Sequence, residues 1–174
     1  MNPKLLLHPN IPKPLHGIAP RVIMGGNWWD IERKKAYSNA NYCCEACGIH
    51  KQDAKLHKWL EAHEIYKYDY SAGVAKFVRL TALCHYCHNF IHNGRLEMLL
   101  REEKITMALY DDIMNHGINI LKKANLLNEW FDRHDVTTLA SWHTWKMLFN
   151  GKLYGPSTNS FAEWEQGKWK NWKP

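Results

Sequence analysis

The chain has 174 residues, of which 45% are hydrophobic and 13% are aromatic, and its formal net charge is +6. This composition excludes wholesale disorder, because enough large apolar side chains are present to offset the entropy lost on folding. The apolar runs are only a few residues long, which excludes a membrane-spanning helix of about 20 residues. The N-terminus also lacks the apolar segment of a secretory signal. We therefore expect a cytoplasmic protein with one folded domain and flanking regions.

The positive charge is concentrated in the first part of the chain. Residues 1–41 contain 6 basic and 2 acidic side chains, residues 42–95 contain 7 and 5, and residues 96–174 contain 10 of each. A basic half beside a neutral half favours a polyanionic partner such as nucleic acid, although solubility alone also explains a charge of this size.

The N-terminal part is predicted to be an arm followed by a helix. Five prolines within residues 1–26 favour an extended arm, because proline interrupts regular helices. From Trp28 to Ala40 the apolar side chains recur at helical spacing, and Arg33, Lys34 and Lys35 occupy the polar side. Residues 1–41 therefore form the first predicted region, a basic arm and helix.

The next predicted region, residues 42–95, alternates short cysteine motifs with strands. Residues 42–50 resemble a zinc knuckle, residues 58–66 and 74–83 are predicted strands, and residues 69–73 are the turn between them. Residues 84–93 lack Pro and Gly and are predicted to form a short helix that ends at Gly94. The predicted order is knuckle, strand, strand, helix.

The last region, residues 96–174, is predicted to be helical and rich in tryptophan. Apolar side chains recur at helical intervals over residues 105–127, with Gly117 as a weak point. Residues 128–174 contain six of the nine tryptophans, which favour a compact aromatic subdomain over base stacking, and residues 151–160 are a predicted loop. The overall expectation is an α+β protein.

All five cysteines and six of the eleven histidines lie between residues 43 and 92. Two C-x-x-C pairs, Cys44/Cys47 and Cys84/Cys87, are 37 residues apart, and reduced thiols at this spacing favour tetrahedral Zn²⁺ coordination over disulfides. Cys43 is the additional thiol. It is either a small buried side chain or a ligand in place of Cys44.

Three histidines lie where a second cation could bind. His88 and His92 are four residues apart, so on a helix they share one face. Strand alternation places Glu61 and His63 on one side of the first predicted strand and Glu64 on the other. A hairpin packed against the helix would bring His63 towards this histidine pair.

These motifs resemble the HNH endonuclease family, whose members have a ββα-metal core. The resemblance covers about residues 42–94: Cys44-Glu-Ala-Cys47, Leu60-Glu-Ala-His63-Glu64 and Leu83-Cys84-His-Tyr-Cys87-His88-Asn-Phe-Ile-His92. It implies a structural zinc held by the four cysteines, His63 as the general base, and one catalytic divalent ion (Mg²⁺, Mn²⁺, Ni²⁺ or Zn²⁺) held by His88 and His92. Arg33, Lys34, Lys35 and Arg79 are the expected contacts to DNA phosphates.

The motif departs from the family at two positions, which leaves alternatives open. Many members have an acidic residue or a histidine directly before the base, where this chain has Ala62, so Glu61 is a candidate metal ligand and Glu64 a candidate catalytic residue. His63 is alternatively a ligand itself. The asparagine that commonly precedes the second cysteine pair is replaced near Arg79-Leu80-Thr81, and Asp69 is either its substitute or a turn residue.

Two functions therefore follow from the sequence. The first is a metal-dependent DNA endonuclease that nicks or cuts by hydrolysis; small basic proteins of this type with a helical tail resemble those of bacteriophages, which would act in the host cytoplasm. The alternative is a catalytically inactive, zinc-stabilised module that binds nucleic acid or protein.

Overall fold

A computed structural model describes residues 1–131 and 140–174 of the chain. Residues 132–139, which belong to the predicted C-terminal region, lie outside the described residues. The α-helices of the described part are α1 (Pro20–Asn39), α2 (His85–Ile91), α3 (Asn93–Arg101), α4 (Met107–Lys123), α5 (Leu127–Phe131) and α6 (Phe161–Glu165). The strands are β1 (Glu61–Asp69), β2 (Val74–Leu83), β3 (Lys146–Phe149) and β4 (Lys152–Tyr154). The predicted α+β class is confirmed.

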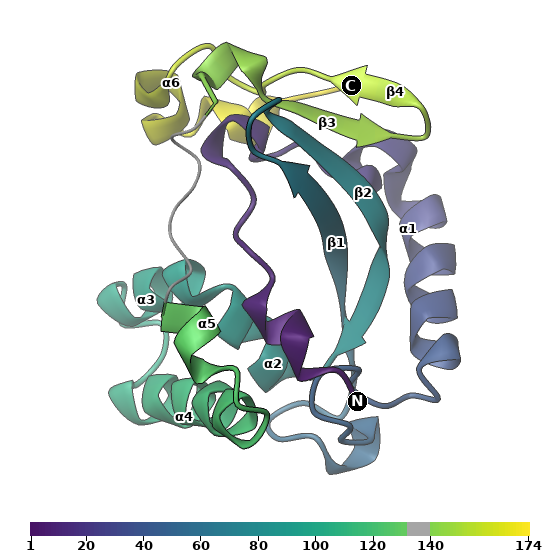
Figure 1. Cartoon of the computed structure of the whole chain (residues 1–174), viewed down its shortest axis with the longest axis vertical. Helices are drawn as coiled ribbons and strands as arrows, with labels where there is room; N and C mark the ends of the chain where they lie inside the picture. The colour runs from purple at the N-terminus through teal and green to yellow at the C-terminus, as the bar shows by residue number, and fades with distance from the viewer. Residues whose placement is uncertain (132–139) are drawn as a thin grey trace. The chain divides into compact units, whose positions relative to one another are not determined.

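The four strands form one mixed sheet in the order β1-β2-β3-β4 (Figure 1). β2 pairs with β3 in parallel, with Val74 opposite Lys146, and β3 pairs with β4 in antiparallel orientation. The turn between β1 and β2 is held by Asp69, whose Oδ1 accepts hydrogen bonds from the Ser71 hydroxyl at 2.8 Å and the Ala72 N–H at 2.9 Å. Asp69 is therefore a turn residue.

The chain divides into two compact units, each assembled from three separate stretches. Unit 1 contains residues 1–10, 33–63 and 80–131, and unit 2 contains residues 11–32, 64–79 and 140–174. The strands β1 and β2 and the helix α1 contribute residues to both units. The cysteine and histidine motifs all belong to unit 1.

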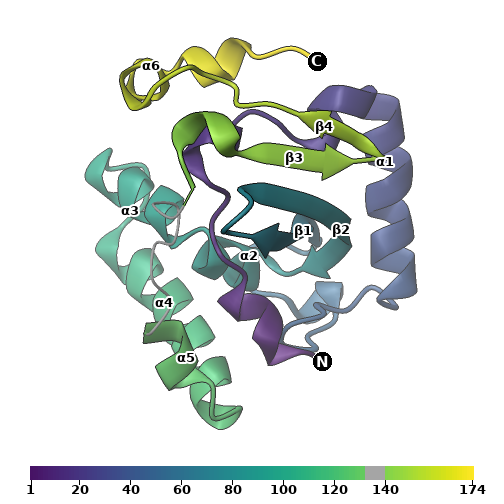
Figure 2. The same ribbon diagram turned by 45° about the horizontal axis from the view of Figure 1, so that its top comes forward.

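Unit 1 is built around α2. This helix packs against α3 and α4, and α5 packs on α4 (Figure 2). Gly117 lies within α4 and does not interrupt this helix. A Cβ atom at this position would lie 2.2 Å from the Phe90 ring of α2, so glycine is required for close packing of the two helices.

Unit 2 has an aromatic core supported by the short strands. In β3, Met147 and Phe149 alternate with exposed or half-buried residues and are themselves buried, as expected for a strand with one covered face. Trp145 is fully buried beside them. The core consists of Leu15, Ile18, Tyr66, Ala75, Ala140, Trp145, Met147 and Phe149.

The N-terminal prediction of an extended arm is wrong in part. Pro3–Leu7 (η1) and Lys13–Leu15 (η2) are 3₁₀ helices, and α1 begins at Pro20 instead of Trp28. Proline is tolerated at the start of a helix because the N–H that it lacks has no intrahelical partner there. The α1 range nevertheless contains a kink at Gly25, whose φ of 80° is accessible to glycine at little cost.

The C-terminal prediction also needs correction, because this region contributes two strands. The whole of β4 lies within residues 151–160, for which the sequence predicts a loop. Strands of three or four residues are too short to show a periodic pattern, and β3 also pairs with a strand distant in the sequence, β2. Similarly, Gly94 does not end the helical region: α3 follows α2 directly.

No helix within the described ranges is both long and apolar enough to span a membrane.

One interaction in unit 2 predicts a specific pH dependence. His16 donates its Nε2–H to the Ile11 carbonyl (3.2 Å), and its Nδ1 accepts the indole N–H of Trp164 (3.1 Å). Burial lowers the pKa of His16, and nearby Lys13 adds to this effect. Protonation of Nδ1 would place an N–H against the N–H of Trp164 and break that hydrogen bond.

Since the pKa of His16 is lower in the folded chain than in the unfolded one, its stabilising effect is complete above the unfolded pKa of about 6.5 and is lost as the pH falls below it. We expect the stability advantage of the parent over His16→Gln to be smaller at pH 5.5 than at pH 7.5. Urea unfolding followed by tryptophan fluorescence measures both values. Parallel pH dependences for the two proteins would contradict this assignment.

Candidate metal centres

The first centre is formed by the four predicted cysteines of unit 1. Cys44 and Cys47 lie in a tight turn closed by the Gly48 N–H, which donates to the Cys44 carbonyl at 2.7 Å, with Gly48 at a φ of +80°. Cys84 precedes α2 as its N-cap and Cys87 lies in its first turn. The four sulfur atoms all lie within 4.8 Å of one another.

The sulfur geometry fits a tetrahedral ion. The Cys47 and Cys84 sulfurs are 3.8 Å apart, whereas a disulfide bond would require about 2.05 Å. Zn–S bonds of about 2.3 Å in tetrahedral geometry place sulfurs about 3.8 Å apart. Hydrogen bonds to Cys44 and Cys47 and burial raise the pKa of Cys87, so the thiols do not all ionise by themselves. A divalent cation among them would replace those protons.

Cys43 lies outside this group. Its Sγ donates to the Asn41 carbonyl at 3.5 Å, and its backbone forms an isolated bridge with His50 on the flank of the turn. Cys43 is therefore not one of the four grouped thiols, and Cys44 occupies the candidate ligand position.

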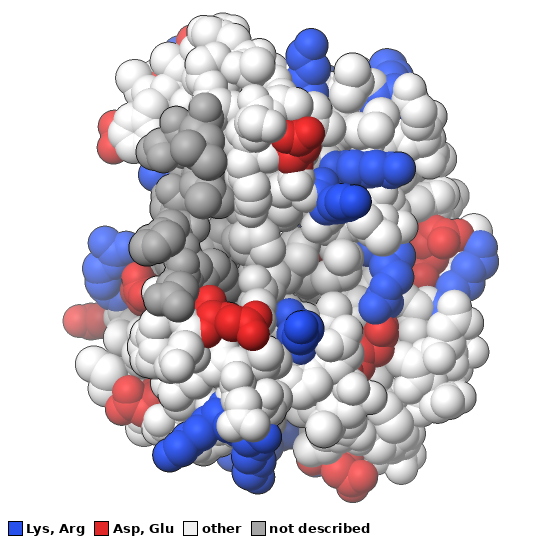
Figure 3. Space-filling view, in the orientation of Figure 1, with Lys and Arg blue, Asp and Glu red and all other residues white. Residues whose placement is uncertain are grey.

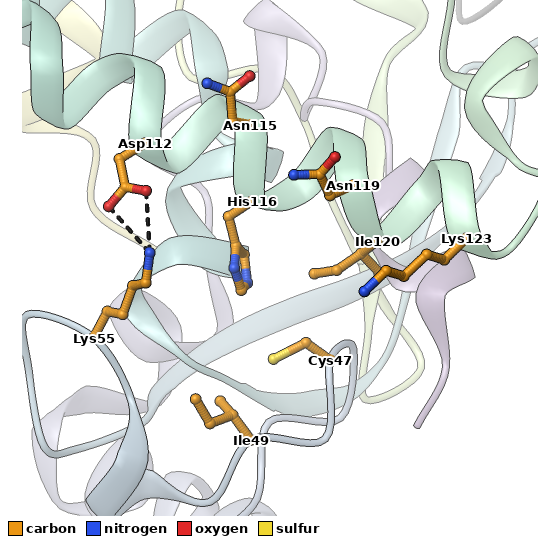
Figure 4. A pocket seen from close by; sticks show the side chains of 9 residues that line it. All are labelled: Cys47, Ile49, Lys55, Asp112, Asn115, His116, Asn119, Ile120 and Lys123. Atoms are coloured by element: carbon orange, nitrogen blue, oxygen red, sulfur yellow. Dashed lines mark hydrogen bonds and ion pairs between the residues drawn. The ribbon is translucent and has the colours of Figure 1, made fainter.

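A pocket of about 370 Å³ lies beside the cysteine group and is lined by residues of α4 and of the 47–55 segment (Figure 4). On one side Asp112 accepts hydrogen bonds from Lys55 (3.1 and 3.2 Å) and from the Tyr86 hydroxyl (2.6 Å). On the other side His116 Nε2 lies 3.4 Å from the Cys87 sulfur. His116 is therefore placed to donate a hydrogen bond to a thiolate, a role that the sequence did not reveal.

The second centre consists of His63, His88 and His92. His63 is buried on β1, at 4% exposure, and the other two are one helical turn apart at α2 and its C-cap. One nitrogen from each lies within 4.8 Å of the others, and His63 Nδ1 is 3.1 Å from His92 Nε2. Metal–nitrogen bonds of about 2.1 Å put adjacent ligands about 3 Å apart, so one cation fits between them.

Burial keeps the imidazoles of His63 and His92 neutral. It lowers the pKa of His63 well below its usual value, with His92, His8 and His88 nearby adding to the effect. It also lowers the pKa of His92 to about 3. A neutral imidazole has a free lone pair, which can bind a cation or accept a proton from water.

Glu61 lies behind His88. Its two carboxylate oxygens accept hydrogen bonds from His85 Nδ1, at 2.6 Å, and from His88 Nδ1. Burial opposes the ionisation of Glu61, but these two hydrogen bonds lower its pKa. With Nδ1 of His88 held by the carboxylate, the lone pair on Nε2 is left for a cation. Both oxygens of the expected ligand Glu61 thus contact imidazoles.

Two further side chains extend this arrangement. Asn89 is buried, donates to the His85 carbonyl at 2.9 Å and accepts from Arg95 at 3.3 Å. His8, from the N-terminal segment of unit 1, has its Nδ1 3.2 Å from His63 Nε2. The His8 contact could not be found from the sequence, because it depends on packing between segments 55 residues apart with no shared motif.

The remaining predicted site residues lie elsewhere. Glu64 belongs to unit 2. Burial is the main cause that raises the pKa of Tyr66 and Tyr68 there, and the negative charge of Glu64 adds to this effect. On α1, Lys34 and Lys35 are exposed, whereas Arg33 is half-buried and hydrogen-bonds to Tyr37. Arg79 is exposed on β2.

The contribution of Glu61 can be measured directly. Glu61→Gln retains an oxygen acceptor but replaces the other with an amide donor, so one imidazole loses its partner. We expect divalent-ion affinity to fall by about 10- to 100-fold, the typical effect of removing a hydrogen-bond partner of a ligand. This affinity is measured by titrating the zinc-loaded protein with Mn²⁺ and monitoring the bound ion by electron paramagnetic resonance. Glu97→Gln on α3 is the matched control; equal affinity in both variants would contradict the role.

No family model, curated protein or solved structure matches this chain. Two groups of side chains among the described residues could each hold a metal ion: the four cysteines and the three histidines.

Proposed function

We propose that the chain is a metal-dependent endonuclease of the HNH type that hydrolyses DNA phosphodiester bonds. The observation that supports it best is the convergence of His63 from β1 with His88 of α2 and His92 at its C-cap, in the same unit as the four grouped cysteines. The order of cysteine turn, β1, β2 and α2 agrees with the ββα-metal arrangement that the sequence motifs resemble.

His88 and His92 would hold the catalytic divalent ion, with Glu61 fixing the orientation of His88. The bound cation supplies charge neutralisation for the phosphate and the departing oxygen. His63 has two possible roles: to take a proton from the attacking water, or to be a third ligand. When His63 takes the proton, the water oxygen forms the new bond to phosphorus, the bond to the 3′ oxygen breaks, and a 5′ phosphate results.

DNA would be bound by basic side chains that contact backbone phosphates. Lys34 and Lys35 of α1 and Arg79 of β2 are exposed. On the face shown in Figure 3, basic side chains are interspersed with acidic ones. The charge pattern therefore supports a few phosphate contacts more than a continuous basic surface.

The test is cleavage of supercoiled plasmid by the zinc-loaded protein in the presence of Mg²⁺ or Mn²⁺. We expect nicked or linear product, and we expect His63→Ala to abolish it without changing zinc content. A parent protein with no divalent-dependent cleavage would overturn the proposal. If His63→Ala cut as fast as the parent, His63 would have neither of its two roles.

The inactive binding module is the second candidate, supported by one observation. Ala62 occupies the position before His63 where many HNH nucleases have an acidic or histidine ligand. Such a module would bind zinc at the cysteines and no second divalent ion. Metal content distinguishes the two candidates before any assay of cleavage.

A further inference from the structure

The N-terminal segment of unit 1 brings a fourth imidazole to the histidine centre. His8 and His63 form an edge-to-face pair with ring centroids 5.0 Å apart, and His8 Nδ1 is 3.2 Å from His63 Nε2. The other ring nitrogen of His63 faces His92. His63 therefore lies between two imidazoles, one on the side of the candidate cation and one on the opposite side.

The segment that carries His8 is anchored without the His8 side chain. Leu5 and Leu6 of η1 are buried, and η1 packs against α2 and α4. The Asn2 N–H donates to the Glu45 carbonyl at 2.6 Å, and the His8 backbone N–H donates to the Leu5 carbonyl at 3.2 Å. A substitution of the His8 side chain leaves all these contacts in place.

The hydrogen bonding of His63 limits what His8 can do. A neutral imidazole carries one N–H and one lone pair. If the lone pair on His63 Nδ1 faces a cation or water, the proton is on Nε2, and the only acceptor on His8 at that distance is Nδ1. His8 would thus accept a hydrogen bond from His63 as Glu61 accepts one from His88, but through an imidazole nitrogen instead of a carboxylate oxygen.

We propose that His8 is a positioning residue of the metal centre, which accepts the Nε2–H of His63 and so fixes the His63 tautomer with the Nδ1 lone pair towards the cation site. This inference deepens the proposed function and rests on it for the identity of the cation site. It applies to both roles of His63, because a ligand and a proton acceptor alike need the lone pair on Nδ1.

The test uses the full-length, zinc-loaded protein and two measurements. Mn²⁺ affinity is determined by electron paramagnetic resonance, and the His63 tautomer is read from long-range ¹H–¹⁵N spectra of the imidazoles without Mn²⁺. We expect His8→Ala to yield a mixture of His63 tautomers and, where His63 is a ligand, to weaken Mn²⁺ binding about 10- to 100-fold. His8→Asn, which restores an acceptor oxygen, should recover part of the affinity and the Nε2–H tautomer.

The matched control is His143→Ala, which removes an exposed imidazole from unit 2. It should change neither measurement. The inference is overturned if His8→Ala retains the Mn²⁺ affinity and the single tautomer of the parent, or if His8→Asn behaves like His8→Ala while both keep their zinc. A parent that binds Mn²⁺ through His63 but does not cut DNA would overturn the proposed function and leave the role of His8 intact.

Discussion

Replacing Cys87 with serine is expected to release the zinc and to unfold unit 1. Cys87 is fully buried at the start of α2, and its sulfur is one of the four that lie within 4.8 Å of one another. Structural zinc sites contribute folding free energy directly. We expect the free energy of unfolding to fall by more than about 4 kcal/mol, the range in which loss of a bound metal is a recognised cause. Zinc content and urea unfolding measure the effect.

Cys43→Ser provides a control in the same turn. Cys43 has the same chemistry and precedes Cys44 directly, but its sulfur contacts the Asn41 carbonyl instead of the other thiols. This variant should keep its zinc and most of its stability. If Cys43→Ser lost zinc and Cys44→Ser kept it, Cys43 and not Cys44 would be the zinc ligand at this turn.

Removal of both helix histidines, His88→Ala with His92→Ala, should eliminate the second divalent ion and with it DNA cleavage. These side chains supply two of the three nitrogens that converge on the candidate site. A cation at the phosphate contributes several kcal/mol to transition-state stabilisation. At 1.36 kcal/mol for each factor of ten, its loss should lower the cleavage rate by about 10³-fold or more.

Metal analysis gives this prediction its control. The parent should contain two divalent ions per chain under saturating Mn²⁺, and the double variant should keep one, held by the cysteines. Unchanged metal content would place the second ion elsewhere. A parent that takes up only one ion would support the inactive module.

The parts of the fold that the sequence predicts are those determined by local pattern. The strand predicted over residues 74–83 agrees with β2, since this run of mainly apolar residues is bounded by turn residues on one side and a cysteine motif on the other. The strand predicted over residues 58–66 is observed as Glu61–Asp69, an error of three residues at each end. The grouping of the cysteines, and of the three histidines, followed from motif spacing.

The parts that escaped prediction depend on contacts between distant segments. Nothing near His8 marks it as a partner of His63, which is 55 residues away. Similarly, one of the two hydrogen-bonding partners of β3 is a strand more than 60 residues earlier. Glu61 was recognised as important because of its place in the motif, but only the packing of β1 against α2 shows that it contacts His85 and His88.

The interleaving of the two units affects how this chain can be synthesised and dissected. Because η1 of unit 1 packs against α4, this contact can form only after all the residues between the two segments have been synthesised. A gene fragment that encodes only residues 42–95 would contain both metal-binding motifs and yet lack the segments that cover α2.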